Sequence, residues 1–195
     1  MGQYYRIAIK EKPFESAVGE NITINDRKVN GIGYISAKLL EHGWMDCVIS
    51  RVVAHKMYNN PIRLAWIGDY ASTHDIESAT ESELNYEKVW GEGTDVSHSF
   101  DYYDIFDHKG KYLVNHSRNM YISFDKWCEL NYNEVHESTL VPFVMLTAIG
   151  GEGEDYYYGY NKFMIGKWAW DILSIEDERP SKEFDEILFN CGCEK

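Results

Sequence analysis

The sequence feature that most constrains the fold is the apolar stretch over residues 62–71, which reads Ile-Arg-Leu-Ala-Trp-Ile-Gly-Asp-Tyr-Ala. A run of this kind, closed by a Gly-Asp pair, is typical of a buried strand that ends in a turn. A partial echo over residues 165–175 reads Ile-Gly-Lys-Trp-Ala-Trp-Asp-Ile-Leu-Ser-Ile. We therefore expect two core strands of one domain, with Trp66 and Trp168 largely buried on neighbouring strands or facing elements.

The rest of the chain predicts an α+β fold, in which a mixed or antiparallel sheet forms the core and a few helices pack on it. Residues 4–10 alternate in polarity as a strand does. Apolar residues at 3–4 spacing after Asp46 predict a helix that stops at Asn59-Asn60-Pro61. Strands do not alternate with helices, which disfavours a parallel α/β fold. At 195 residues, one domain over 1–195 is expected.

The second half of the chain predicts more strands than helices. Strands are expected at 101–106, 111–115, 120–124 and 140–149, and at Trp168. A brief helix capped by Asp125 is expected to run to Leu130. Ser181 is expected to cap a C-terminal helix through Phe189, with Phe184, Ile187 and Leu188 facing inward.

Most of the negative charge lies in one segment. The chain carries a net charge of −13, and residues 69–107 hold eleven carboxylates against the single base Lys88, a net of −10. Residues 72–107 are either a solvated insertion within the domain or an acidic docking surface. The docking interpretation names these binding residues: Glu77, Glu81, Glu83, Glu87 and Asp95.

The charge balance also restricts the partners. A surface this acidic repels phosphate backbones and anionic lipid, so we expect no direct nucleic-acid or membrane binding. It suits a basic protein partner, a cation or simple solubility. No stretch approaches the length of a membrane span, and the start lacks the apolar run of a signal peptide. We therefore expect a cytoplasmic protein with reduced thiols. Nothing in the sequence predicts an oligomeric state.

No cofactor and no metal site is expected, although His74, Asp75 and His98, with Asp95 and Asp101, would supply metal ligands if they converged in space. The Gly150-Gly151-Glu152-Gly153 loop lacks the Lys and Ser or Thr of a phosphate-binding loop, and its carboxylates would repel phosphate. The lone Cys-Gly-Cys near the end of the chain supplies two thiolates, which is too few for a structural zinc site.

Four polar residues at the ends of apolar segments are the candidate catalytic set: His42, Asp69, His116 and Asp171. Burying such groups without hydrogen bonds costs about 1–3 kcal/mol each. Either they satisfy one another and cap turns, or they share a pocket in which a His acts as general base and an Asp as its partner.

Several short motifs, in the same order along the chain, resemble a widespread family of bacterial, phage and some eukaryotic proteins that open with Met-Gly-Gln-Tyr-Tyr. The matching stretches here are residues 1–5, 38–42, 66–71, 112–116 and 165–171. The resemblance implies a single domain and a frequent home in phages and mobile elements, and it implies no reaction. This chain departs at Trp170, where the family tends to have glycine.

Two functional hypotheses follow. The first is an acidic cytosolic binding protein, which in a phage setting would inhibit a basic host defence protein by presenting carboxylates where phosphates sit. The second is a small hydrolase or transferase that uses the His/Asp set.

Overall fold

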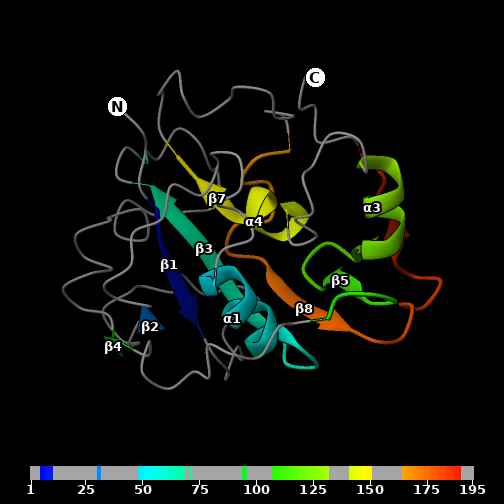
Figure 1. Ribbon diagram of the computed structural model, residues 1–195. Coiled ribbons are helices and arrows are strands. Elements are labelled where there is room, and N and C mark those ends of the chain that lie inside the picture. The colour runs from blue at the N-terminus through cyan, green and yellow to red at the C-terminus, as the bar shows by residue number, and fades with distance from the viewer. Residues whose placement is uncertain are drawn as a thin grey trace.

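The stretch that begins at Ile62 forms the central strand of a mixed β-sheet in the computed structural model of the protein (Figure 1). Strand β3 (Ile62–Gly68) pairs antiparallel with β1 (Tyr5–Lys10) along its length. The structure describes residues 5–10, 30–31, 48–68, 71, 94–95, 107–131, 141–150 and 164–189, and of residues 5–8, 10, 30–31, 48–52, 94–95 and 141 it describes the backbone alone.

The second edge of β3 is shared by three segments. Its first residues pair antiparallel with β8 (Ile172–Glu176), and its last residues pair parallel with β7 (Ala148–Ile149). Between them, the Trp170 backbone N donates to the Leu64 carbonyl O at 2.8 Å. Residues 62 and 64–68 of β3 are buried, on both faces of the sheet. Burial on both faces explains why this stretch is apolar without alternation.

The sheet extends to each side of β3 in the order β4-β2-β1-β3-β8-β5-β6-β9, with β7 beside β3. On one side lie β2 (Asn30–Gly31) and β4 (Thr94–Asp95), which pair in parallel. On the other side β8 pairs with β5 (Tyr112–Asn115), β5 with β6 (Met120–Ser123), and β6 with β9 (Asp185–Glu186). The predicted strands at 4–10, 111–115 and 120–124 are therefore confirmed.

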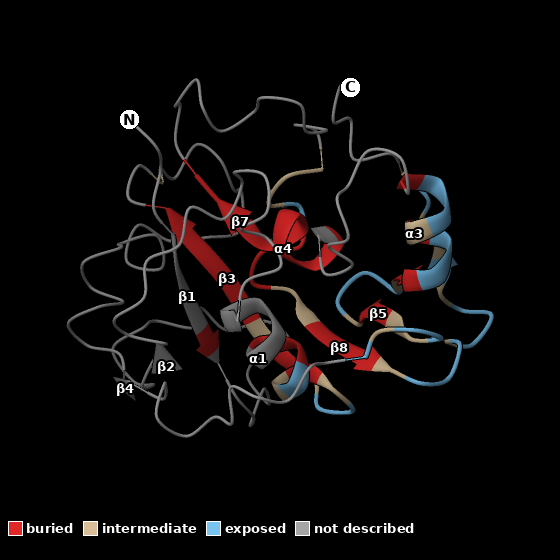
Figure 2. Ribbon diagram, in the orientation of Figure 1, coloured by how far each residue is buried: buried red, intermediate tan, exposed pale blue. Residues whose placement is uncertain are grey.

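Three helices complete the described part of the fold. Helix α1 (Val48–Met57) contacts β8, α4 (Val141–Thr147) contacts β3, and α3 (Phe124–Asn131) contacts β6. The core lies between these helices and one face of the sheet, and in it Trp66 and Phe143 lie 6.5 Å apart between ring centroids. Figure 2 shows β3, β7 and α4 buried almost throughout, whereas α3 has an exposed outer face. The α+β class, with a mixed sheet in one domain, is confirmed at this level.

The prediction of a strand over 140–149 is wrong for most of its length, because residues 141–147 form helix α4. Periodicity does not separate a short buried helix from a buried strand when every position is apolar. Pro142 fits the first turn of a helix, where its missing N–H is not required. Thr147 Oγ1 also donates to the Phe143 carbonyl O at 2.8 Å, which is a helical contact. Only Ala148 and Ile149 continue as a strand.

The expected strand at Trp168 is also wrong, because residues 164–170 form consecutive turns and the strand begins at Ile172. Two backbone N–H groups of these turns meet the last carbonyls of α4. The Gly166 N donates to the Met145 O at 3.0 Å, and the Trp168 N donates to the Leu146 O at 2.8 Å. The turns therefore satisfy a helix end that would otherwise be buried without donors. Trp66 and Trp168 are buried, as predicted.

The C-terminal helix predicted over 181–189 is absent, because residues 185–186 pair with β6 instead. The Asp185 N donates to the Asn119 O at 2.9 Å, and the Ile187 N donates to the Tyr121 O at 2.8 Å. An open strand edge offers carbonyls that need donors, and this segment supplies them. Leu188, expected to face inward, is 58% exposed.

Helix α3 begins earlier than its expected cap. Ser123 occupies the capping position, because its Oγ accepts the Lys126 backbone N–H at 3.4 Å. Asp125 lies inside the first turn, and its Oδ1 accepts the Gly110 N–H at 3.0 Å. Asp125 therefore fixes the turn before β5 rather than the helix start.

Candidate functional site

The structure describes two members of the predicted catalytic set in full, His116 and Asp171. His42 and Asp69 lie outside the described residues, as do four predicted binding residues, Glu77, Glu81, Glu83 and Glu87. Asp95 is placed through its backbone in β4, at one edge of the sheet. The expected strand at 101–106 also lies outside the described part of the chain.

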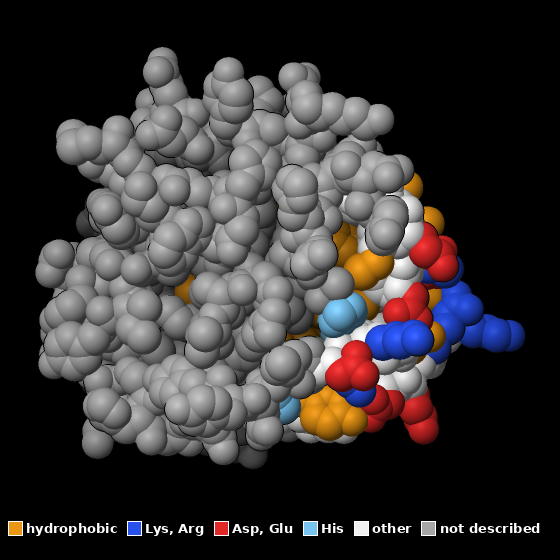
Figure 3. Space-filling model, viewed as in Figure 1, with side chains coloured by type: hydrophobic (Ala, Val, Ile, Leu, Met, Phe, Trp, Pro, Cys, Tyr) orange, Lys and Arg blue, Asp and Glu red, His pale blue; other side chains and the backbone are white. Residues whose placement is uncertain are grey.

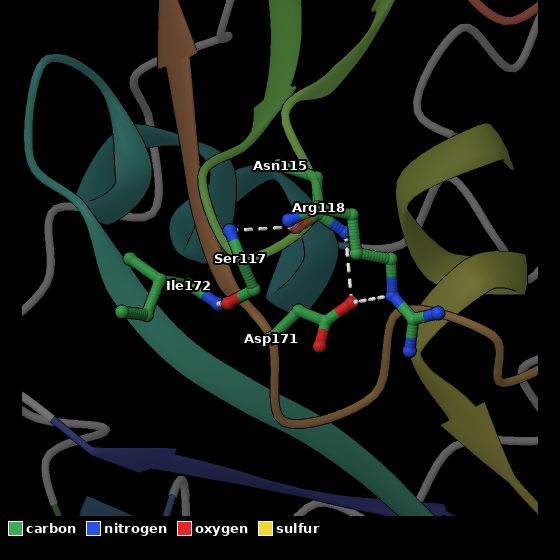
Figure 4. A network of polar contacts seen from close by, with 5 residues as sticks. All are labelled: Asn115, Ser117, Arg118, Asp171 and Ile172. Atoms are coloured by element: carbon green, nitrogen blue, oxygen red, sulfur yellow. Dashed lines mark hydrogen bonds and ion pairs between the residues drawn. The ribbon is translucent and has the colours of Figure 1, made fainter. Parts of the chain in front are cut away.

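Asp171 belongs to a polar network at the end of β5, where the loop over residues 116–119 meets the start of β8 (Figure 4). Its Oδ2 accepts a hydrogen bond from the Asn115 Nδ2 at 2.8 Å and from the Arg118 Nε at 2.6 Å. The Asn115 Oδ1 accepts the backbone N–H groups of Ser117 at 3.0 Å and of Arg118 at 3.1 Å. Ser117 Oγ accepts the Ile172 N–H at 2.8 Å. The network joins the loop to β8.

Burial explains why these groups are paired. Asn115 is fully buried, and the Asp171 side chain is 14% exposed. A buried amide or carboxylate without partners costs about 1–3 kcal/mol or more, so each needs its hydrogen bonds. This supports the first of the two interpretations made from sequence for Asp171, in which polar strand-end residues satisfy their neighbours and hold a turn.

His116 engages a different group of residues. Strand alternation places it on the face opposite to Asn115, together with Ser174 and Glu176 of β8. Its Nε2 lies 2.8 Å from the Ser174 Oγ and 3.3 Å from the Glu176 Oε1. The Ser174 hydroxyl donates a hydrogen bond to the Glu176 Oε1 at 2.7 Å. The Ser174 oxygen therefore accepts a hydrogen bond from the His116 Nε2–H. The Phe184 ring packs edge-on at 6.1 Å between centroids.

The chemistry of this second group differs from that of a hydrolytic triad. In a triad the serine and the carboxylate contact opposite nitrogens of the imidazole. Here both approach Nε2, and Ser174 has no exposed surface to offer a substrate. The described hydrogen bonds thus link His116 to Ser174, and Asp171 to Asn115 and Arg118, without joining the two predicted catalytic residues. The enzyme hypothesis still depends on His42 and Asp69.

A third polar cluster joins three segments that sequence reasoning did not connect. Lys111, just before β5, places its Nζ 2.6 Å from the Asp177 Oδ1, just after β8. The Tyr58 hydroxyl, at the end of α1, donates to the Asp177 Oδ2, and the Lys111 Nζ lies 4.7 Å from the Tyr58 ring centroid. No local signal identifies this cluster, because its members come together only when β5 and β8 pair antiparallel.

The ion pair in this cluster shifts the pKa of both partners. The hydrogen bond and charge of Asp177 raise the pKa of Lys111 above its ordinary value, against a smaller opposing effect of burial. The hydrogen bond from Lys111, followed by that from Tyr58, holds the pKa of the Asp177 carboxyl below its ordinary value. The cluster therefore keeps both groups charged and fastens the end of α1 to the sheet.

No group of three or more His, Cys, Asp or Glu side chains within the described residues is arranged to hold a metal ion. None of the helices in the described part of the chain is both long and apolar enough to cross a membrane.

Comparison with known proteins gives no match to a family model, to a curated protein or to a solved structure. The resemblance to the proteins that open with Met-Gly-Gln-Tyr-Tyr therefore stays a hypothesis. One structural observation concerns it directly. Trp170, the position at which that family tends to have glycine, has a φ of 64°. Glycine adopts this left-handed conformation without steric penalty, whereas a bulky residue rarely does.

Proposed function

We propose that the protein works by binding a basic partner rather than by catalysis. The observation that carries the proposal is the concentration of ten net negative charges between residues 69 and 107, in a chain whose total is −13. A field of this strength, confined to one segment, attracts a cationic surface and accelerates its association.

The described remainder of the protein has a different charge pattern. There the bases Lys111, Arg118, Lys126 and Arg179 each pair with a carboxylate of the same chain. Figure 3 shows acidic and basic side chains interspersed over the described surface. The segment 69–107 contains one base, so its carboxylates outnumber any partners within it. We expect the excess carboxylates to be the groups that a basic partner contacts.

The sheet fixes the places from which this segment leaves and to which it returns. Residue 69 follows the last residue of β3, and residue 107 precedes the turn that leads into β5. Both strands are largely buried, and β4 adds a point of attachment at the sheet edge. A surface carried between rigid strands can vary in sequence without disturbing the core.

The finer proposal concerns the partner class. Carboxylates spaced along an acidic segment can occupy the positions that phosphates take on a nucleic-acid-binding protein. In the phage setting suggested by the family resemblance, such a protein would inhibit a basic host defence factor. The charge of the segment and that resemblance support this step.

The test compares two variants that lose the same number of charges. The first carries Glu77→Gln, Glu81→Gln, Glu83→Gln and Glu87→Gln. The matched control carries Glu129→Gln, Glu178→Gln, Glu183→Gln and Asp185→Asn, four exposed acidic residues outside the segment. At about 0.2–1 kcal/mol per exposed ion pair, the first variant should bind a purified basic DNA-binding protein roughly tenfold or more weakly at low salt.

The control should bind nearly as the wild type does, and both variants should melt as the wild type does, because exposed carboxylates add little stability. Association rates measured at low and high salt complete the test, since the first variant should lose much of its salt dependence. Equal binding by the two variants, or binding that is indifferent to salt, would contradict the proposal.

A further inference from the structure

The loop between β5 and β6 holds an arginine in a fixed position at the surface. Arg118 lies in this loop, over residues 116–119, and its side chain is 47% exposed. We propose that Arg118 binds the carboxylate group of a ligand through the outer edge of its guanidinium. Arg118 lies outside residues 69–107 in the sequence, and the proposal does not depend on the function proposed for that segment.

Both ends of the Arg118 residue are held by buried groups. The Asp171 Oδ2 receives its Nε at 2.6 Å, and the Asn115 Oδ1 receives its backbone N–H at 3.1 Å. Asn115 in turn donates to the same Asp171 oxygen at 2.8 Å and has no exposed surface. An exposed arginine ordinarily loses rotamer freedom when it binds. Here the fold has already restricted the side chain, so less entropy is lost on binding.

The Arg118 guanidinium has donors besides the Nε. Figure 4 shows the two terminal nitrogens directed away from Asp171, and within the described part of the chain no acceptor bonds to them. A guanidinium has five N–H donors, and the Nε uses one. The pair of donors on the outer edge matches the two oxygens of a planar carboxylate.

Arg179 shows how this chain uses an anchored arginine elsewhere. Its Nε donates to the Tyr121 hydroxyl at 2.7 Å, and its Nη2 lies 3.4 Å from the Glu186 Oε2. Arg179, with its Nε fixed, thus binds a carboxylate of its own chain through a terminal nitrogen. Arg118 also has its Nε fixed, although by the Asp171 carboxylate rather than by a neutral hydroxyl, and no described carboxylate contacts its terminal nitrogens.

The charge of the protein selects a monoanion. The Asp171 and Arg118 charges largely offset each other at the site, so the net charge of −13 decides: a phosphate dianion meets about twice the long-range repulsion that a carboxylate meets. A carboxylate gains the same two hydrogen bonds with less repulsion. A small organic acid and an acidic side chain of a peptide both supply this group.

Two residues beside the site have a left-handed backbone. Asn119 follows Arg118 and has a φ of 53°, and Trp170 precedes Asp171 and has a φ of 64°. This conformation is common for Asn, whereas for a bulky residue such as Trp170 it persists only where the surroundings over-determine it. These two residues place the loop and the start of β8 so that Arg118 and Asp171 meet.

The experiment is an NMR titration of the full chain labelled with ¹⁵N. It follows the Nε–H signal of Arg118 and the backbone signals of Arg118 and Asn119, at constant ionic strength. Sodium acetate, the blocked peptide acetyl-Gly-Asp-Gly-amide and sodium phosphate are the three probes. Acetate and the peptide should give saturating shifts with dissociation constants on the order of 10 mM, and phosphate should bind several-fold more weakly. A peptide that binds about tenfold more tightly than acetate assigns the site to acidic peptides, and equal affinities assign it to small organic acids.

The variant Arg118→Lys keeps the charge and removes the two-pronged edge, so it should weaken acetate binding about tenfold. Arg179→Lys is the matched control and should leave the shifts at the loop unchanged. The wild-type titration decides the question even if Arg118→Lys does not fold. Shifts that grow linearly without saturation, equal affinity in Arg118→Lys, or tighter binding of phosphate would overturn the proposal and leave Arg118 with a purely structural role.

Discussion

The two tryptophan stretches, residues 62–68 and 164–171, resemble each other in sequence and differ in backbone. The first is the central strand β3, and the second is a run of turns that bridges β3 and the end of α4. Both bury their tryptophans, because Trp66 is fully buried and Trp168 is 2% exposed. The two stretches therefore share the burial of their tryptophans but differ in backbone conformation.

The difference comes from two positions with left-handed backbone. Gly166 has a φ of 70° and Trp170 a φ of 64°, whereas no described residue of β3 has a positive φ. Both positions lie within the turns over 164–170, in which backbone N–H groups reach the Met145, Leu146 and Leu64 carbonyls. A composition that favours a strand is thus overridden by hydrogen bonds that a strand would not make.

The largest expected effect tests what the stretches share. Trp66→Ala and Trp168→Ala should each lower the free energy of unfolding by about 3–5 kcal/mol, because each removes a fully packed indole. Denaturant unfolding measures both. Leu188→Ala, at a side chain 58% exposed, is the control and should change stability by less than about 0.5 kcal/mol. A mild effect at Trp168 alone would mean that the turn stretch is not part of the core.

The next largest expected effect is a loss of stability on substituting Gly166, one of the two left-handed positions of the turn stretch. A Cβ there would lie 2.8 Å from the Ala148 carbonyl O, at a φ of 70°. Gly166→Ala should therefore lose more than about 2 kcal/mol, from the left-handed backbone and from the clash together. Gly110 has a φ of 72°, and a Cβ added there would meet no atom within 4 Å. Substitution at Gly110 therefore measures the cost of the left-handed backbone without the clash. Gly110→Ala should lose about 1–2 kcal/mol, and equal losses at both glycines would rule out the clash.

A smaller effect is the difference in stability between the glycine and alanine variants, which should have opposite signs at Trp170 and Trp168. Trp170→Gly should be more stable than Trp170→Ala by about 1 kcal/mol, since glycine relieves the left-handed strain. The φ angle of Trp168 is not positive. Trp168→Gly should therefore be less stable than Trp168→Ala, by about 0.4–1 kcal/mol. The same order of glycine and alanine at both positions would contradict the backbone difference.

The smallest expected effect is a pH dependence of stability at the end of β8. Strand β8 follows the turn stretch, and Asp177, which comes directly after it, forms an ion pair with Lys111. The depressed pKa of Asp177 contributes stability that is present above the ordinary value of 3.8 and is lost as pH falls through the folded pKa. The raised pKa of Lys111 contributes stability that is present below 10.5 and is lost as pH rises through the folded pKa. Melting curves of Asp177→Asn should lose both dependences, and Asp185→Asn, an equal charge change, should keep them.

Sequence patterns were sufficient where a single physical pattern dominates. The 3–4 spacing before Asn59-Asn60-Pro61 identified α1, and the alternation at residues 4–10 identified β1. Segments with more than one solution were mispredicted. The all-apolar run before Ile149 fits a buried helix as well as a strand, and the residues after Ser181 pair with an open strand edge that the local sequence does not reveal.

For the candidate site, residue types alone predict that polar groups at strand ends need partners, because unpaired buried polar groups are costly. They also predict the negative field over residues 69–107, because charge follows directly from composition. The pairing itself follows from the fold. Strands β5 and β8 run antiparallel, which brings Asn115 and Arg118 to Asp171 and places His116 on the opposite face. Strand register sets which side chains meet, and register depends on contacts between residues more than fifty positions apart.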